Sequence, residues 1–347
     1  MRLPIRVRLQ NLLTRIRSWE YWPFGIVQAP LFFQWLWYAC RSGSLFWFST
    51  SNPSIYTGGM MGESKADVLA LIPDHLKPTT LLIRVPADVA QVKSAMEAAG
   101  LEFPCIFKPD LGERGWMVRL IADEDEAAAY LEEIKVDFLI QAYVALPLEF
   151  GVFYVRKPDA ERGRIVSLTA KSMLTVQGDG SSTLGELIIN NDRARLQAVR
   201  LHRFLKHRWH HVLPAGEQLM INGIGNHCLG TMFLDAGHLV NPEMEEAFDR
   251  ISRNIPGFFF GRFDLRCASE SDLRESRVKI LELNGCGAEP AHIYQPGFPL
   301  FRAMGILIRH MSDMFEVSMQ NHRNGTPFLG FREGLEVYRR VQKTMGK

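Results

Sequence analysis

Two short segments carry oxygen-bearing side chains whose types and spacing suit a metal ion. Glu282 and Asn284 lie two residues apart at the end of one strand-like run, 278–283, and Asp264 lies in another, 257–266. Side chains alternate between the faces of a strand, so Glu282 and Asn284 point the same way. With the second strand alongside, Asp264 completes an all-oxygen site of the kind that Mg²⁺ prefers, with Mn²⁺ as an alternative. A polar strand face remains the other interpretation of the Glu-x-Asn tripeptide alone.

A glycine-containing loop follows a short apolar strand that ends in a lysine. The strand 103–107 runs into Lys108, and the loop holds Gly112 and Gly115. Glycine lets the backbone approach a ligand closely, so the loop can present N–H groups to phosphate oxygens while Lys108 adds a positive charge. An ordinary hairpin turn is the alternative for this loop by itself. Further on, the apolar strand 138–144 breaks at Pro147, where Glu149 can accept hydrogen bonds from ribose hydroxyls.

The order of these elements, from about residue 62 to 310, resembles the ATP-grasp superfamily of carboxylate–amine ligases, which includes D-alanine:D-alanine ligase. The resemblance implies an α+β fold in which two α+β lobes hold ATP between them. It further implies that Lys108 lies at the adenine and α-phosphate, that Lys171 is the second phosphate lysine and that Lys65 precedes the lid. The lid itself would be the flexible loop from Gly112 to Gly115.

The same resemblance assigns the remaining site residues. The backbone of the hinge strand would read adenine, one carboxylate would bind ribose, an arginine would lie beside an acyl-phosphate, and three side chains would hold the magnesium. The hinge residues are Gln141, Tyr143 and Val144, and the ribose carboxylate is Glu149. The arginine is Arg262, and the magnesium ligands are Asp264, Glu282 and Asn284.

A second resemblance lies inside the first. Residues 176–188 and 212–217 are similar to the corresponding stretches of cyanophycin synthetase and related amino-acid ligases, although a capping box at Thr183 and Glu186 explains part of this pattern structurally. The lid reads Gly-Glu-Arg-Gly, and residues 285–294 lack the serine–leucine pair that D-alanine:D-alanine ligase uses for its second substrate. A D-Ala-D-Ala product is therefore not expected.

Composition excludes few classes. The 347 residues carry a net charge of +2 and no clustered basic face, so nucleic acid is not an expected partner. The five cysteines have neither paired spacing nor an even count, which favours a reducing cytoplasm over a disulfide framework or zinc. Cys286 is interpreted as a buried small residue rather than a nucleophile. The histidines of segment 201–211 are interpreted as part of a solvated basic helix end.

The amino-terminal segment is unusual. Five arginines precede the uncharged, Trp-rich run 21–40, which contains Pro23 and Pro30. The prolines are expected to interrupt this run, and its aromatic residues suit a membrane–water interface. Three interpretations stay open: an interfacial anchor formed by residues 1–48 on the cytoplasmic face of the inner membrane, a helix docked on the catalytic lobes or on a partner in a homodimer, and a true span.

These patterns predict five regions. They are the basic, Trp-rich segment 1–50, a linker and reduced preceding domain at 51–84, a small lobe at 85–145, a large lobe at 146–320 and a tail at 321–347.

The predicted function is that of an ATP-dependent, ADP-forming ligase that activates a carboxylate as an acyl-phosphate and joins it to an amine. Arg262 and Lys171 are the expected catalytic residues, and the substrates are small molecules or groups linked to lipid or peptide. The alternative is a membrane-associated nucleotide-binding scaffold or sensor that makes no ligase product.

Overall fold

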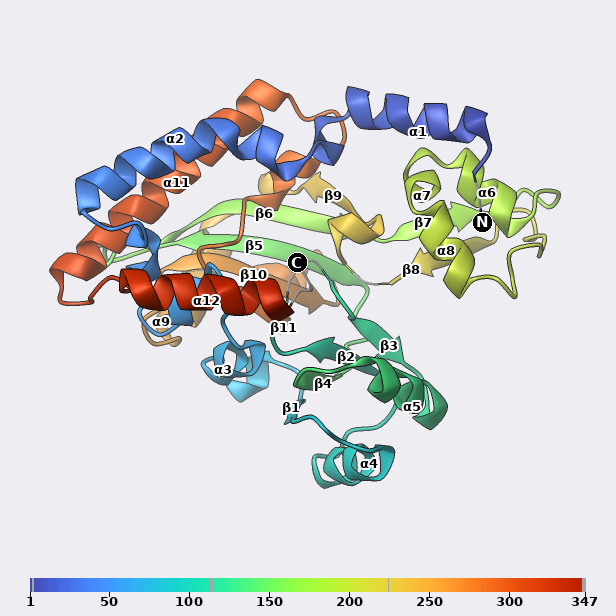
Figure 1. The fold of residues 1–347 in the computed structure, drawn as a ribbon, viewed down its shortest axis with the longest axis horizontal. Coiled ribbons are helices and arrows are strands. Elements are labelled where there is room, and N and C mark those ends of the chain that lie inside the picture. The colour runs from blue at the N-terminus through green and yellow to red at the C-terminus, as the bar shows by residue number, and fades with distance from the viewer. Residues whose placement is uncertain (2, 113–114, 224, 345–347) are drawn as a thin grey trace.

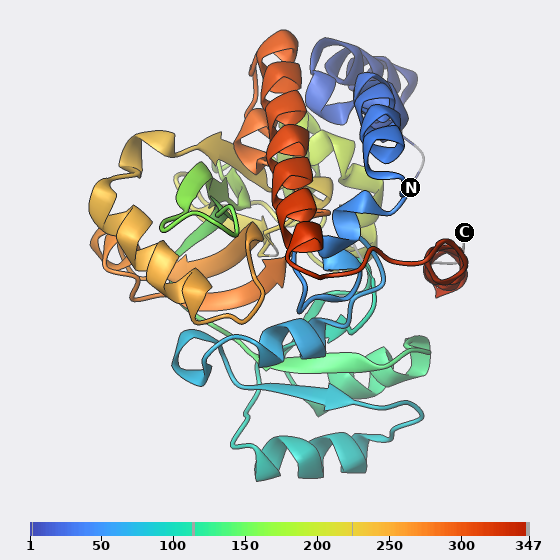
Figure 2. The ribbon, with the colours of Figure 1, turned by 90° about the vertical axis from the view of Figure 1, so that its left-hand side faces the viewer.

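The computed structural model describes residues 1, 3–112, 115–223 and 225–344, so Glu113 and Arg114 of the predicted lid lie outside the described residues. Within this part, the strands form a four-stranded sheet, a five-stranded sheet and a two-stranded ribbon (Figure 1). The predicted α+β fold class is confirmed. Figure 2 shows the four-stranded lobe below the five-stranded one.

The small lobe is an antiparallel sheet with strand order β1-β4-β2-β3, covered on one face by two helices. Its core includes Phe107, Tyr130 and Phe138, which pack edge to face. Because strand faces alternate, Lys108 and Gln141 lie on the opposite face of the sheet from this core. The elements are β1 Thr80–Ile83, α4 Val89–Ala98, β2 Cys105–Pro109, β3 Arg119–Ile121, α5 Glu124–Glu133 and β4 Phe138–Ala142. Strand β1 thus places the start of the lobe before the predicted boundary at residue 85.

The large lobe is an antiparallel sheet with strand order β11-β10-β5-β6-β9. Helix α9 covers one face, where Phe248 packs on Phe263. Helix α11 covers part of the other face, where Phe153 and Phe260 are fully buried. The elements are β5 Leu148–Val155, β6 Arg164–Ser172, β9 Met232–Asp235, α9 Pro242–Arg253, β10 Phe260–Cys267, α10 Glu270–Arg274, β11 Lys279–Asn284 and α11 Leu300–Arg323.

A small subdomain projects from the large sheet between β6 and β9. It contains the two-stranded ribbon and three short helices around a core that includes Leu184 and Trp209. The predicted capping box is confirmed, because Thr183 and Glu186 exchange hydrogen bonds at the start of α6. The elements are β7 Leu174–Gln177, α6 Leu184–Asn190, α7 Asp192–Leu196, α8 Ala198–Phe204 and β8 Gln218–Asn222.

The amino-terminal helices α1, Ile5–Arg17, and α2, Phe24–Ser42, lie end to end along one edge of the molecule (Figures 1 and 2). Helix α2 continues through Pro30, so the predicted interruption at that residue is wrong. The proline costs one intrahelical hydrogen bond, but α2 packs along α11, where Tyr38 stacks on Phe315 with ring centroids 4.0 Å apart. Within the described residues, no helix has the length and apolar character needed to cross a bilayer.

Residues 51–60 were expected to belong to a linker, but together with residues 47–50 they form a wedge between β10 and α11. The side chain of Asn52 is fully buried and accepts hydrogen bonds from the backbone N–H groups of Phe259, 2.9 Å, and Phe260, 3.0 Å. Its amide group donates to the carbonyl oxygens of Gly58 and Phe260. A linker could not satisfy four buried backbone groups in this way, so the wedge belongs to the large lobe.

The wedge is followed by helix α3, Lys65–Ala70, which leads to the small lobe. At the other end of the chain, the predicted tail contains helix α12, Phe331–Thr344.

Candidate functional site

The predicted site residues of the large lobe form rows across neighbouring strands. On β10 and β11, Asp264 lies opposite Glu282, and Arg262 lies opposite Asn284. On the other side of β10, Asp264 lies opposite Gly151 of β5. A Cβ at Gly151 would approach Asp264 Oδ1 to 3.3 Å and Arg262 Cδ to 3.2 Å, so glycine leaves room for these larger side chains. The sheet therefore brings the three predicted metal ligands together.

Asp264 is the centre of this arrangement. Its carboxylate accepts hydrogen bonds from Arg262 Nε, 3.1 Å, and Nη2, 3.0 Å, from Lys171 Nζ, 3.1 Å, and from Asn284 Nδ2, 3.0 Å. Burial by itself would raise the pKa of Asp264, but Arg262 and Lys171 lower it to about 2. The carboxylate is thus ionised at any pH near neutral and is fixed in position by its partners.

A second row joins Arg266, Glu149 and Lys171 across β10, β5 and β6. Glu149 accepts a hydrogen bond from Arg266 Nε at 2.9 Å and another from Lys171 Nζ at 3.1 Å. Burial would lower the pKa of Lys171, but Asp264 and Glu149 raise it overall. Both oxygens of Glu149 are engaged, so its role as the ribose ligand stays a prediction.

A β-bulge links the large lobe to the small one. The register shift between β10 and β11 leaves Leu281 as an extra residue, because Asp264 pairs with Glu282 whereas Leu265 pairs with Ile280. The carbonyl oxygen of Leu281 accepts hydrogen bonds from Lys108 Nζ at 3.1 Å and from Gln141 Nε2 at 3.3 Å. The bulge thus supplies the acceptor that positions two small-lobe side chains.

Lys108 is buried among neutral partners. Besides Leu281, its ammonium group donates to Gln141 Oε1 at 3.1 Å. Burial lowers the pKa of Lys108 to about 8, although Glu282 and Asp264 oppose the shift. The carboxylates of Glu282 and Asp264 therefore influence Lys108 electrostatically, but Lys108 makes no ion pair within the described part of the chain.

Gly112, at the start of the lid, contacts Lys65, the first residue of α3. Lys65 Nζ donates to the carbonyl oxygen of Gly112 at 2.5 Å. Gly112 has a φ of 140° and Gly115 a φ of 72°, values that favour glycine over other residues. Lys65 precedes the lid, as the resemblance implies, and its ammonium group contacts the backbone at the start of the lid.

The hinge differs from the expected strand. Strand β4 ends at Ala142, so Tyr143 and Val144 follow it rather than belong to it. The carbonyl oxygen of Val144 accepts a hydrogen bond from Arg266 Nη1 at 2.7 Å, and the Arg266 guanidinium lies 5.5 Å from the Tyr143 ring centroid. The side chain of Gln141 points to Lys108 and to Thr80 Oγ1, 3.1 Å away, rather than to solvent.

Arg266 and Glu289 also belong to the site, although neither was predicted from the sequence. Arg266 shares a strand face with Arg262 and Asp264, so the two-residue periodicity of the strand could have identified it. Glu289 accepts a hydrogen bond from Arg262 through its backbone carbonyl at 3.2 Å, and its carboxylate accepts from Gln28 and Tyr294. No local pattern indicates that α2 reaches this carboxylate.

The oxygen-rich row fits a divalent cation in its chemistry. Among the described residues, no group of three or more His, Cys, Asp and Glu side chains gathers to hold a metal, and the predicted set has two carboxylates and one amide. The Glu282 carboxylate accepts no hydrogen bond from any described residue, whereas Asp264 is fully engaged with protein donors. Asp264, Glu282 and Asn284 would therefore hold the cation, with Arg262 and Lys171 sharing Asp264.

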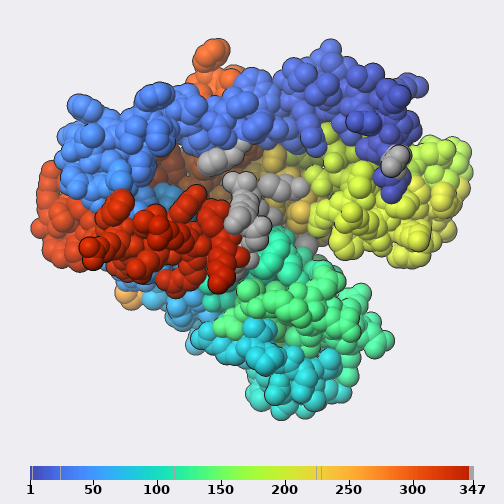
Figure 3. Space-filling model, viewed as in Figure 1, coloured from blue at the N-terminus to red at the C-terminus, as the bar shows by residue number. Residues whose placement is uncertain are grey.

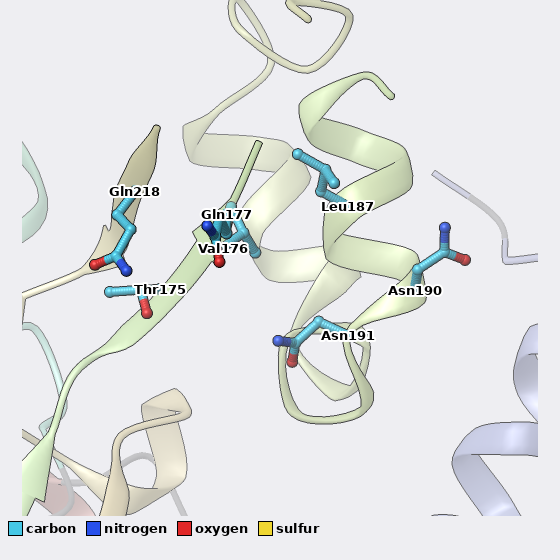
Figure 4. A pocket seen from close by; sticks show the side chains of 7 residues that line it. All are labelled: Thr175, Val176, Gln177, Leu187, Asn190, Asn191 and Gln218. Atoms are coloured by element: carbon cyan, nitrogen blue, oxygen red, sulfur yellow. The ribbon is translucent and has the colours of Figure 1, made fainter. Parts of the chain in front are cut away.

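A separate pocket of about 410 Å³ lies in the subdomain, between β7, β8 and α6 (Figure 4). Its lining residues are Thr175, Val176, Gln177, Leu187, Asn190, Asn191 and Gln218. None of these side chains is charged, so the pocket lacks the cations that nucleotide phosphates require. It includes no predicted site residue.

Cys286 and the histidine-rich segment were interpreted as structural. Cys286 is 2% exposed, and burial raises the pKa of its thiol to about 12, which is unsuited to a nucleophile. In the histidine-rich segment, α8 ends at Phe204 and Trp209 is buried, while His210 and His211 are exposed. The basic segment is thus only partly helical.

Neither a protein-family model nor a curated protein matches the chain. Among solved structures, a D-alanine–D-alanine ligase from Bacillus anthracis matches with 13% identity over 78% of this chain and 71% of that chain, at a TM-score of 0.45. A D-Ala:D-Ser ligase from Enterococcus faecalis matches with 13% identity over 73% of this chain and 62% of that one, at a TM-score of 0.39.

A bifunctional glutathione synthetase from Pasteurella multocida matches with 13% identity over 70% of this chain and 35% of that chain, at a TM-score of 0.37. The TM-scores of these matches lie below 0.5 and their identities below 25%, so the matches assign no role to a residue of this chain.

Proposed function

We propose that the chain is an ATP-dependent ligase that forms an amide bond from a carboxylate and an amine. The observation that carries this proposal is the convergence, where the lobes meet, of two carboxylates and an amide with three buried cations. The carboxylate and amide oxygens suit Mg²⁺, and the cations suit the phosphates of ATP. The residues are Asp264, Glu282 and Asn284, and Lys108, Lys171 and Arg262.

In the first step, an oxygen of the substrate carboxylate attacks the γ-phosphorus of ATP, the bond to the β–γ bridging oxygen breaks, and ADP leaves. Lys108 and Lys171 stabilise the negative charge on the phosphates during this transfer. A magnesium ion held by the oxygen ligands would supply further charge neutralisation. The product of this step is an acyl-phosphate.

In the second step, the amine nitrogen attacks the acyl carbon, loses a proton and displaces phosphate. Arg262 is placed by Asp264 and by the carbonyl of Glu289, so its guanidinium is fixed beside the metal row. There it would stabilise the oxyanion of the tetrahedral intermediate. No protein nucleophile takes part, and the buried Cys286 thiol is not needed.

Glu289 would recognise the incoming amine. Its carboxylate has two neutral donors, Gln28 and Tyr294, and forms no salt bridge within the described part of the chain. Burial would lower the pKa of Arg262, but Asp264 and, more weakly, Glu282 and Glu289 raise it overall. An ammonium group on the acceptor would complete the charge balance of Glu289.

The experiment measures ADP release from ATP across a panel of carboxylate and amine pairs, with hydroxylamine as a substitute for the amine. Carboxylate-dependent ADP and hydroxamate formation, with ¹⁸O moving from the carboxylate into phosphate, is the expected result. Nucleotide binding without any carboxylate-dependent ADP would overturn the proposal and favour the scaffold alternative.

The variant Glu289→Gln tests the amine site separately. It should raise the KM for a cationic amine but leave hydroxamate formation intact, because hydroxylamine is neutral at pH 8 and does not need a carboxylate partner. An equal loss with both acceptors would show that Glu289 acts only through Arg262.

A further inference from the structure

Helix α1 exposes most of its apolar side chains instead of burying them against the protein. Its inward face packs on α7 through Val7 and through Asn11 and Thr14, which accept hydrogen bonds from Arg195 at 3.0 and 3.2 Å. Its outward face consists of leucine and isoleucine side chains between 50% and 75% exposed: Ile5, Leu9, Leu12, Leu13 and Ile16. A soluble surface helix normally shows the reverse pattern.

Helix α2 also has two apolar faces, only one of which is covered. Val27 and Leu31 are buried against α11 and its neighbours. On the other side, Ile26, Phe33 and Trp37 are 60%, 72% and 62% exposed. These three residues are spaced by seven and four positions, so they form one stripe along the helix. Their exposure is not explained by packing within the described chain.

The exposed charged residues of α1 are all positive. Glu20 is the one acidic residue in the first 62 positions of the sequence. Its side chain is 6% exposed and paired with Arg193 and His227, at 3.2 and 2.8 Å. Arg6, Arg8, Arg15 and Arg17 are exposed, and none has an ion pair with another described residue.

The surrounding surface continues the pattern. Figures 1 and 3 show α1 and α2 along one edge of the molecule, with the start of α11 projecting beside them. That projecting turn carries Phe301, which is 90% exposed. The small lobe lies on the opposite side of the molecule (Figure 1).

We propose that this edge, termed the α1–α2 edge and formed by the outward faces of both helices, binds the surface of an anionic membrane without spanning it. The leucine, isoleucine and aromatic side chains would enter the headgroup region, and the arginines would contact lipid phosphates. A second copy of the chain fits this edge less well, because it would bring the same arginines together without exposed acids to pair them.

The segment from Trp19 to Gln28 connects the α1–α2 edge with the candidate site by hydrogen bonds. Trp19, between α1 and α2, donates a hydrogen bond to the carbonyl oxygen of Phe298 at 2.6 Å, and Gln28 of α2 donates to Glu289. If the proposed function holds, membrane binding would place the amine side of the active site next to the bilayer. The binding itself does not depend on ligase activity.

The experiment is co-flotation of the full-length protein with vesicles of phosphatidylcholine, with or without phosphatidylglycerol. The full chain is needed because the wedge that follows α2 is part of the large lobe's core. An apolar variant carries Leu9→Gln, Leu13→Gln, Phe33→Gln and Trp37→Gln, and a charge variant carries Arg6→Gln, Arg8→Gln and Arg15→Gln. A matched control replaces two exposed aromatics of α12, Phe331→Gln and Tyr338→Gln, which are 62% and 52% exposed.

The wild type and the control are expected to float with the anionic vesicles. The charge variant should bind about 100-fold more weakly, from about fivefold for each arginine, and the apolar variant should not bind. Circular dichroism and nucleotide binding verify that all variants fold. Absence of wild-type flotation, or equal flotation of all variants, would overturn the proposal. So would a dimer in sedimentation that only the apolar variant disrupts, which would make the edge a self-association surface.

Discussion

The two sides of the lobe interface each bury one lysine within the electrostatic influence of Asp264, but with different partners. On the large-lobe side, Lys171 lies between Glu149 and Asp264, and these carboxylates raise its pKa despite burial. On the small-lobe side, Lys108 has the oxygens of Gln141 and Leu281 as partners, and burial lowers its pKa to about 8. The protein neutralises one cation itself and leaves the other without a counter-ion.

This difference indicates a division of labour. Lys171 and its carboxylates form a balanced network that is stable without any ligand, because each buried charge has an opposite partner. Lys108 is costly to keep charged until an anion arrives, so a nucleotide phosphate would gain more from Lys108 than from Lys171. The charged residues of the large-lobe side would therefore keep the site in place without a ligand, and Lys108 of the small-lobe side would respond to nucleotide binding.

The largest effects are expected within the large-lobe network itself. Glu282→Gln and Asp264→Asn should each reduce ADP formation by at least about 100-fold, because each removes a negative charge from the magnesium ligands. Their stabilities should differ. Asp264→Asn leaves Arg262 and Lys171 without a shared anion and should lower the free energy of unfolding by about 3 kcal/mol. Glu282→Gln should change it by less than about 0.5 kcal/mol.

Urea denaturation and an ADP-coupled assay check these two variants, with the exposed Glu97→Gln as a control. Equal stability of Asp264→Asn and Glu282→Gln would show that the Asp264 ion pairs do not hold the sheet together.

The second prediction exchanges each lysine for methionine. Lys171→Met should destabilise the protein by about 3 kcal/mol, because it leaves two buried carboxylates with one cation fewer. Lys108→Met should change stability by less than about 1 kcal/mol, since relief of the buried charge offsets the lost hydrogen bonds. It should nevertheless weaken ATP binding by about 1.5–3 kcal/mol.

Thermal unfolding and calorimetric titration with ATP separate these effects. If Lys108→Met is the less stable variant and binds ATP normally, the two sides of the interface have been assigned the wrong roles.

The third prediction concerns pH. Above a pKa of about 8 the free protein loses the Lys108 proton, and nucleotide binding must restore it. The ATP affinity of the wild type should then fall by about tenfold per pH unit between pH 8.5 and 10, where nucleotide phosphates are already fully ionised. The lowered pKa of Lys108 affects the free energy of unfolding in the opposite direction to the ATP affinity. The folded protein holds fewer protons than the unfolded chain above pH 8, so the contribution of Lys108 to stability rises with pH until the ordinary lysine pKa.

Calorimetry at pH 9 in buffers of different ionisation enthalpy should detect uptake of about one proton by the wild type and none by Lys108→Met. Proton uptake that persists in the variant would assign the titration to another group.

The smallest effect is expected when Lys108 is given an anionic partner, as Lys171 already has on the large-lobe side. Gln141→Glu would give Lys108 an anionic partner and raise its pKa. The pH dependence of ATP affinity should flatten between pH 8 and 10, while affinity at pH 7 should fall by about tenfold or less. The measurement is the same titration, with Thr80→Val as a control that removes only the Gln141–Thr80 hydrogen bond. An unchanged pH profile would mean that Gln141 does not control the charge of Lys108.

The juxtaposition of Asp264, Glu282 and Asn284 was predictable because it depends on local periodicity. Alternation along 280–284 and 262–266 places Glu282 with Asn284, and Arg262 with Asp264, on common faces, and antiparallel pairing then joins them. The same rule would have included Arg266. The bulge at Leu281 was not predictable, because a single extra residue leaves no mark in the pattern of polar and apolar residues. Yet this bulge presents the carbonyl oxygen that Lys108 and Gln141 use.

The errors at the amino-terminal end have a different cause. Residues 51–60 look like part of a linker because serine, proline and glycine favour turns, but the wedge makes hydrogen bonds to partners more than 200 positions away. Pro30 suggested a break in α2, yet the covered face of the helix packs on α11 along its length. Such long-range contacts override local preference, and one sequence alone does not reveal them.

The buried Asn52 side chain has a consequence for synthesis on the ribosome. Its partners Phe259 and Phe260, at the start of β10, lie 207 and 208 residues later, and Thr50 donates to the carbonyl oxygen of Ser318, 268 residues later. At a synthesis rate of 5–20 residues per second, roughly 10–40 s pass between the emergence of Asn52 and that of β10. During this delay α1 and α2 are already outside the ribosome, while the strands and helix that complete the large lobe do not yet exist. The apolar helices are thus available to a chaperone or to a lipid surface before the catalytic body has folded.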